Sequence, residues 1–236
     1  MGNFNLKVEN FINIFIHQNG YTRVLEGLRN TLIIAVVGLI IGILIGTVIA
    51  TVRVIPKYKL LPRILNGICG FYVSMFRGTP IVVQLLVFYY VLLPLMGMRV
   101  SGLQVSVLVF GLNSGAYISE IMRSGIQSVD PGQLEAARAV GMPYSVSMLK
   151  VVVPQAVKNI LPTLGNEFIA LVKETAVVGY VGAIDITNSF QYQGANSYEY
   201  MIPYLVMAIL YIVIVAIIAW GVKIMERKLG KSERRK

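Results

Sequence analysis

The stretch NTLIIAVVGLIIGILIGTVIATV, Asn30 to Val52, carries no charged residue and is bounded by Arg29 and Arg53. A helix needs about 20 apolar residues to cross the hydrocarbon core of a bilayer, so this stretch is long enough. The whole chain has the same character, since 56% of its 236 residues are hydrophobic and 14% are charged. Soluble globular domains carry about 25% charged residues. The sequence therefore predicts a polytopic membrane protein.

Other uncharged intervals predict the remaining membrane spans. Three more are long enough to cross, and they run from Gly78 to Met98, from Val100 to Ser119 and from Tyr200 to Val222. A fifth interval, Val151 to Gly182, is apolar apart from scattered charged residues, and we count it as a span. We predict an all-α fold with five transmembrane helices in a single domain, residues 1–236.

Lysine and arginine cluster at two places that set the predicted orientation. Residues 53–63 (RVIPKYKLLPR) and 223–236 are basic, whereas residues 183–200 hold Asp185 and Glu199 and no basic residue. Basic connections stay in the cytoplasm. We therefore expect the N-terminus outside, the C-terminus inside, and the connection between the third and fourth spans in the cytoplasm. This distribution accounts for the net charge of +10 without nucleic acid as a partner.

The first span also carries three glycines at a spacing of four residues, Gly38, Gly42 and Gly46. Small residues at this spacing let a second helix approach closely in lipid. The stripe indicates helix packing within the subunit, with a contact between subunits as the alternative.

Polar residues at membrane depth usually face the protein interior or a water-filled cavity. Asn113, Tyr117 and Glu120 fall on one helical face at i, i+4 and i+7, and Asn166 and Glu167 follow a proline in the next span. We take these five residues as the candidate substrate-binding set. Two structural alternatives stay open: Glu120 pairs with a neighbouring arginine, and Asn166 and Glu167 satisfy each other at a helix break.

The segment FRGTP, residues 76–80, precedes another apolar run and predicts a kink, because Pro80 disfavours helical geometry at Thr79. Gln84 lies one turn further on and faces the same side. Arg77, Thr79 and Gln84 are therefore the candidate gate or pathway residues.

The composition argues against several kinds of chemistry. One cysteine, Cys69, and one histidine, His17, offer neither an internal disulfide nor a metal centre built on these residues. Residues 230–232 read GKS, but Met225 stands where a phosphate-binding loop needs its first glycine. No catalytic set is visible, so we expect no catalytic residue, no metal and no cofactor in this chain.

The segment DPGQLEAARAVGMP, residues 130–143, predicts a short cytoplasmic helix over about 131–142. Asp130 is placed as its N-cap, Pro131 suits its first turn, and Gly141 ends it. From spacing alone, the helix either caps the bundle or enters a groove on another protein.

Glu135-Ala136-Ala137, three residues, Gly141, nine residues and then VVVP, residues 151–154, resemble the EAA loop of ABC importer permeases. Valine stands at 151 and 153 where that pattern has isoleucine and leucine. Residues 77–80, 117–142 and 154–175 resemble the polar amino acid branch, the permeases for histidine, glutamine, glutamate and arginine. The resemblance covers the chain from about Gly27 to Arg227.

The resemblance implies the transmembrane domain of a type I ABC importer in the bacterial cytoplasmic (inner) membrane. Its expected partners are a second permease subunit, identical or related, a cytoplasmic ABC ATPase dimer that binds ATP and Mg, and an extracytoplasmic amino-acid-binding protein. The segment about 131–142 would be the coupling helix. Its ATPase-coupling residues would be Gly132, Glu135, Ala136, Ala137 and Gly141.

The expected substrate is a polar or basic amino acid, because Glu120 or Glu167 would suit a cationic side chain. The main alternative is an ion- or proton-coupled secondary transporter or channel in which these two glutamates carry protons or cations. The absence of a detectable inverted repeat argues against that alternative. An intramembrane enzyme is a third and weaker reading.

Overall fold

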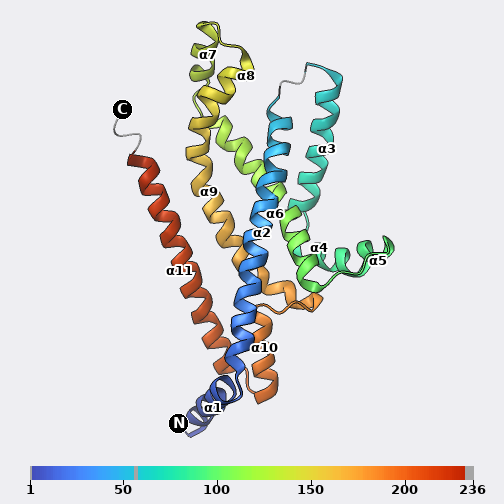
Figure 1. Ribbon diagram of the computed structural model, residues 1–236, viewed down its shortest axis with the longest axis vertical. Coiled ribbons are helices and arrows are strands. Elements are labelled where there is room, and N and C mark those ends of the chain that lie inside the picture. Colours follow the sequence, from blue (N-terminus) through green and yellow to red (C-terminus); the bar gives the residue numbers. More distant parts are fainter. Residues whose placement is uncertain (1, 56–57, 232–236) are drawn as a thin grey trace. The chain divides into compact units, whose positions relative to one another are not determined.

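The computed structural model describes residues 2–55 and 58–231, and its regular elements in these ranges are all helical (Figure 1). Lys57 and residues 232–236 of the basic tail lie outside the described residues. The prediction of an all-α fold is confirmed. In chain order the elements are α1 (Gly2–Ile12), η1 (Asn13–His17), α2 (Gly20–Val54), α3 (Leu60–Arg77), α4 (Ile81–Val87), η2 (Phe88–Leu92), α5 (Leu93–Leu95), α6 (Gly102–Gln127), α7 (Pro131–Ala139), α8 (Tyr144–Ser147), η3 (Met148–Val152), α9 (Val153–Glu174), η4 (Thr175–Val181), α10 (Ile186–Ser197) and α11 (Met201–Lys231).

Three of the described helices are long and apolar enough to cross a membrane: α2, α6 and the part of α11 over Met201–Lys228. A fourth span results if α3 and the helical stretch Ile81–Leu95 are counted together as one broken span. The predicted span Val151–Gly182 corresponds to the end of η3, α9 and η4, which are not among these three helices. The count of five spans therefore stays a prediction.

Helix α3 is not predicted by the spacing of charges. Its uncharged core, residues 64–76, lies between Arg63 and Arg77 and is too short for a span by that measure. The predicted span Gly78–Met98 instead begins with a break at residues 78–80 and continues as the shorter elements α4, η2 and α5. Charge spacing misses α3 because Arg63 lies inside this helix and Arg77 ends it, which leaves too short an uncharged interval.

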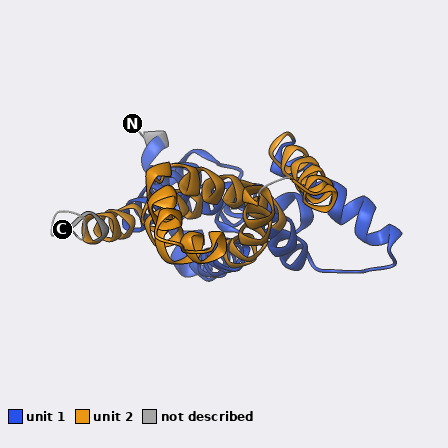
Figure 2. Cartoon of the chain, turned by 90° about the horizontal axis from the view of Figure 1, so that it is seen from above, with its two compact units in different colours: residues 1–38, 79–111, 169–218 blue, residues 39–78, 112–168, 219–236 orange. Residues whose placement is uncertain are grey.

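Packing divides the chain into two compact units (Figure 2). Unit 1 comprises residues 1–38, 79–111 and 169–218, and unit 2 comprises residues 39–78, 112–168 and 219–236. The prediction of a single domain over residues 1–236 stays a prediction.

Unit 1 contains a core in which α10 packs against the beginning of α2. Val24, Ile186 and Phe190 are buried there, and Phe11 and Phe15 of the N-terminal segment pack against them. Asp185 begins α10 as its N-cap, because its carboxylate accepts hydrogen bonds from the backbone amides of residues 187 and 188 at 2.9 and 3.0 Å. Burial raises the pKa of the Asp185 carboxyl, and these two hydrogen bonds oppose the rise.

The end of α10 has an unusual backbone. Tyr198 adopts a left-handed conformation with φ of 51°. Its amide donates to the Ala195 carbonyl at 3.4 Å, and the Glu199 amide donates to the Gly194 carbonyl at 3.1 Å. This hydrogen-bond pattern ends many helices, usually with glycine at the left-handed position. A residue with a Cβ costs about 1–2 kcal/mol there.

The glycine stripe of α2 packs against α6 of the same chain. In unit 2, a Cβ built on Gly42 would lie 2.6 Å from Ser114 Oγ, and one built on Gly46 would lie 2.8 Å from Ile118 Cγ2. In unit 1, Gly38 is in a similar position beside Phe110. The structure therefore supports helix packing within the subunit as the role of this stripe.

We predict that Gly42→Ala lowers the thermal unfolding midpoint of the detergent-purified subunit. Real Cβ contacts are rarely as short as the one at Gly42, so the two helices must separate, at a cost of about 1–3 kcal/mol. The matched control is Gly67→Ala on α3, where nothing lies within 4 Å of the added Cβ. Equal midpoints for the two variants would contradict this account of the α2–α6 contact.

Candidate functional site

Helix α6 presents the polar face that the sequence predicts. In unit 2, Asn113 is 4% exposed and its amide nitrogen donates to the Phe76 carbonyl at 3.4 Å. Tyr117 is 37% exposed, and the Arg77 guanidinium lies over its ring at 5.2 Å from the centroid. A cation above an aromatic face is attracted by the ring quadrupole. The structure thus joins a predicted gate residue, Arg77, to a predicted substrate-binding residue, Tyr117.

Glu167 of α9 reaches the same part of unit 2. Ser114 Oγ donates to Glu167 Oε1 at 3.4 Å, so the carboxylate is linked to the residue that follows Asn113. Asn166 is exposed beside it. Ser114 is a site residue that spacing did not indicate, although its place next to Asn113 on a predicted polar helix is a signal for it.

Glu120 is held by arginines from two helices. One carboxylate oxygen pairs with Arg53 of α2, and the other accepts from Arg123 Nη2 at 2.7 Å and Nε at 3.1 Å. The Glu120 side chain is 17% exposed. Both of its oxygens are therefore engaged within the subunit, which is the structural alternative that the sequence left open for this residue. The Arg53 contact spans 67 residues and has no local signal in the sequence.

Thr79 and Gln84 come together in unit 1, as the sequence predicts. The Gln84 amide nitrogen donates to the Thr79 carbonyl at 3.0 Å and to Thr79 Oγ1 at 2.9 Å. Between them Pro80 has an extended backbone, φ −63° and ψ 139°, and is followed by the first residue of α4. Gln84 is 7% exposed. These contacts fix the start of α4 after the break.

The predicted short helix exists as α7, and its two ends form as the sequence indicates. The Asp130 carboxylate accepts from the Gly132 amide at 2.8 Å, and Pro131 opens the helix. At the other end Gly141 has φ of 87°, its amide donates to the Arg138 carbonyl, and the next amide donates to the Ala137 carbonyl. Glycine suits this position because the left-handed conformation disfavours a Cβ.

One face of α7 packs against the rest of the subunit, and the opposite face is exposed. Leu134 contacts a buried cluster in unit 2 that consists of Val129, which follows α6, Val152 of η3, and Ala156 and Ile160 of α9. Side chains of α6 pack against the same cluster. Ala137 is 7% exposed, whereas Glu135 and Ala136 are exposed. Ala137 therefore belongs to the internal packing of the chain. Glu135 and Ala136 remain accessible from outside it.

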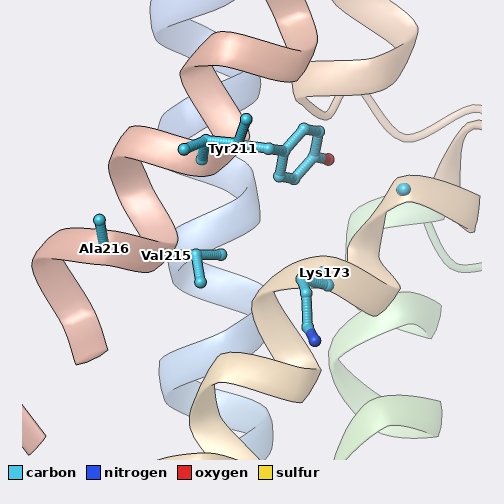
Figure 3. A pocket seen from close by; sticks show the side chains of 6 residues that line it. Lys173, Tyr211, Val215 and Ala216 are labelled. Carbon is cyan, nitrogen blue, oxygen red and sulfur yellow. The ribbon is translucent and has the colours of Figure 1, made fainter.

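Two pockets of the described structure lie away from the polar face of α6. One of about 560 Å³ lies between α9 and α11 in unit 1, and Figure 3 shows Lys173 and Tyr211 among its lining side chains. Its walls are otherwise apolar, so they offer few partners for the charged groups of an amino acid. A second pocket, of about 670 Å³, lies between α7 and α9 in unit 2 and is polar.

No group of three or more His, Cys, Asp or Glu side chains in the described residues could hold a metal ion. The expectation of no metal and no cofactor in this chain stays a prediction.

The family model of the binding-protein-dependent transport system inner membrane component matches residues 38–231. The chain belongs to this family. It is therefore a permease, a membrane component of a transport system and not an enzyme. Its place in the inner membrane follows from the family description.

Curated relatives of the permease include bacterial amino acid permeases. The arginine transport system permease protein ArtQ of Bacillus subtilis (strain 168) is 40% identical over 89% of this chain and 94% of its own length. The probable glutamine ABC transporter permease protein GlnM of the same organism is 31% identical over 94% of this chain and 100% of its own length.

Solved structures share the fold of the permease. A crystal structure of an amino acid ABC transporter with histidines is 37% identical, covers 91% of this chain and 98% of its own, and superposes with a TM-score of 0.82. An inward-facing MetNI methionine ABC transporter is 21% identical with a TM-score of 0.73, which shows a common fold. The prediction of a type I importer fold is confirmed.

We predict that Glu120→Gln and Arg53→Gln each destabilise the permease by about 1–3 kcal/mol, because each leaves a charged partner unsatisfied. The double variant should lose less stability than the sum of the losses in the two single variants, because both members of the pair are then removed. Chemical unfolding of the four proteins in detergent measures this coupling. Additive losses would show that Arg53 and Glu120 do not act as a pair.

Proposed function

We propose that this permease is the transmembrane subunit of an ABC importer for a polar or basic amino acid. The observation that carries the proposal is its similarity, at 37% identity and over 91% of the chain, to an amino acid ABC transporter structure. The relatives named for arginine and glutamine transport support the same substrate class.

The importer needs partners that this chain does not supply. We propose a cytoplasmic ABC ATPase dimer that binds ATP and Mg, a second permease subunit and an extracytoplasmic amino-acid-binding protein. The family description names dependence on a binding protein and supports the last of these. The lack of a phosphate-binding loop in the sequence supports a separate ATPase.

In this proposal α7 is the coupling helix, it lies in the cytoplasm, and the N-terminus of the chain lies outside. Exposed Glu135 and Ala136 contact the ATPase, with Gly132 giving close approach at the first turn. Ala137 fixes α7 to its own chain and Gly141 ends the helix, so both act by positioning. Movement of α7 reaches α6 and α9 through the cluster around Leu134, because packed interiors transmit displacement.

The substrate-binding proposal rests on the polar contacts in unit 2. Glu167 suits a cationic side chain, and the exposed Arg77 beside Tyr117 suits the α-carboxylate of any amino acid. Asn113 lies one helical turn before Tyr117, and Asn166 directly precedes Glu167, so each adds an amide group close to one of these residues along the chain. Glu120 stays in the proposed set with the least support, because two arginines already engage its carboxylate. Thr79 and Gln84 are proposed to hold the helix break that gates the path.

We predict that Glu135→Ala lowers the rate of ATP-driven uptake roughly tenfold, since charged contacts across an interface are commonly worth this much. The unfolding midpoint should not change, because Glu135 is exposed and outside the buried cluster. Uptake into proteoliposomes that contain the ATPase is the measurement, and Glu9→Ala, an exposed glutamate on α1, is the control. Normal uptake by Glu135→Ala would remove this residue from the coupling contact.

We predict that Glu167→Gln raises the KM for arginine uptake about tenfold and leaves glutamine uptake within a factor of two, because the substitution removes charge and keeps the shape. Competition between the two labelled amino acids in proteoliposomes measures the selectivity. Unchanged KM values for both would place Glu167 in a structural network with Ser114 instead.

A further inference from the structure

Tyr198 combines two features that local structure does not explain. It holds the left-handed conformation that ends α10, and its side chain is 94% exposed. Among the described residues other than glycine, Asn19 alone shares a positive φ, and asparagine tolerates that conformation. The same hydrogen-bond pattern at the end of α7 uses Gly141.

Packing within the described residues does not compensate for the tyrosine at this position. A ring that is 94% exposed gains little from burial, so glycine or asparagine would suit the turn better. Strained residues of this kind persist where they serve a function. Tyr198 is therefore a candidate for a contact outside the chain.

The side chains around Tyr198 have the chemistry of a protein-binding surface. The last two turns of α10 expose Gln191, Tyr192, Ala195 and Asn196, with no aliphatic side chain larger than alanine and no cation among them. Tyrosines among small and amide side chains are typical of protein-recognition surfaces, because a tyrosine offers a large contact area at low entropic cost. Beneath this face the Arg23 guanidinium stacks on the Tyr192 ring at 4.2 Å and donates to the Asn188 side chain at 2.9 Å, which holds the ring in place.

The neighbouring start of α11 differs and serves as an internal comparison. There Tyr200 and Tyr204 are exposed together with Met201 and Leu205, a mixture of aromatic and aliphatic side chains. That mixture is typical of a helix entering the lipid interface. The exposed end of α10 has no large aliphatic side chains of this kind.

We propose that the outer tyrosine surface, defined as Gln191, Tyr192, Ala195, Asn196 and Tyr198, is a docking contact for the extracytoplasmic binding protein. The inference rests on the proposed function, including the orientation that places α10 outside. Dependence on a binding protein is named in the family description, and it supplies the partner. Tyr198 is the anchor of this contact, held away from the helix by its left-handed backbone.

The test uses Tyr198→Gly and Tyr198→Asn in the complete importer, assembled in nanodiscs. An amino-acid-binding protein of the same organism is saturated with arginine, or with glutamine if arginine does not bind, and is titrated against ATP hydrolysis. Both variants should raise the half-saturating concentration of binding protein about tenfold and leave basal hydrolysis unchanged. Their unfolding midpoints should equal or exceed that of the unaltered protein, because both residues tolerate the left-handed turn.

The matched control is Tyr58→Gly, which removes a 92% exposed tyrosine from the predicted cytoplasmic connection. Its titration should match that of the unaltered protein. Unchanged titrations for both Tyr198 variants would overturn the inference and leave Tyr198 as a membrane-interface residue. A lowered unfolding midpoint would also overturn it, because it would give the ring a structural role. If no binding protein stimulates the unaltered importer, the proposed function itself fails, which is a separate result.

Discussion

The packing of Leu134 against Val129, Val152, Ala156 and Ile160 is the interaction on which the functional account depends. It attaches a nine-residue helix to two long helices, α6 and α9, that carry the candidate polar residues. Without this attachment α7 would be a loose surface helix, since isolated helices of that length are marginal in water. With it, a force applied to the exposed side of α7 acts on the helices that carry Asn113 and Glu167.

Several charged side chains of unit 2 have partners of the kind that a membrane protein requires. A charge at membrane depth needs a partner or water, because hydrocarbon offers no hydrogen bonds. Glu120 meets this requirement with two arginines, and Glu167 is hydrogen-bonded to Ser114. Arg77 and Tyr117 are more exposed and stack on each other. The fully paired group is suited to hold helices together, and the exposed pair is suited to meet a substrate.

Much of this arrangement could be predicted from the sequence wherever the signal is local. The caps of α7, the common face of Asn113, Tyr117 and Glu120, and the break before α4 all follow from residues within a few positions of one another. The pairing of Arg53 with Glu120 could not be predicted, because it joins positions 67 residues apart.

Two further features escaped prediction for physical reasons of their own. Helix α3 was not predicted because the uncharged interval between its two arginines is too short for a membrane span. The left-handed turn at Tyr198 was not predicted because glycine or asparagine usually occupies such a position at the end of a helix. The proposed docking contact rests on this residue.

The most direct measurement of the central claim is uptake of labelled arginine and glutamine into proteoliposomes of defined composition. The account predicts that uptake requires ATP, the ATPase and the binding protein together with this permease, and that the permease alone moves neither amino acid. Accumulation by the permease alone, driven by a proton or sodium gradient, would contradict it and establish a secondary transporter.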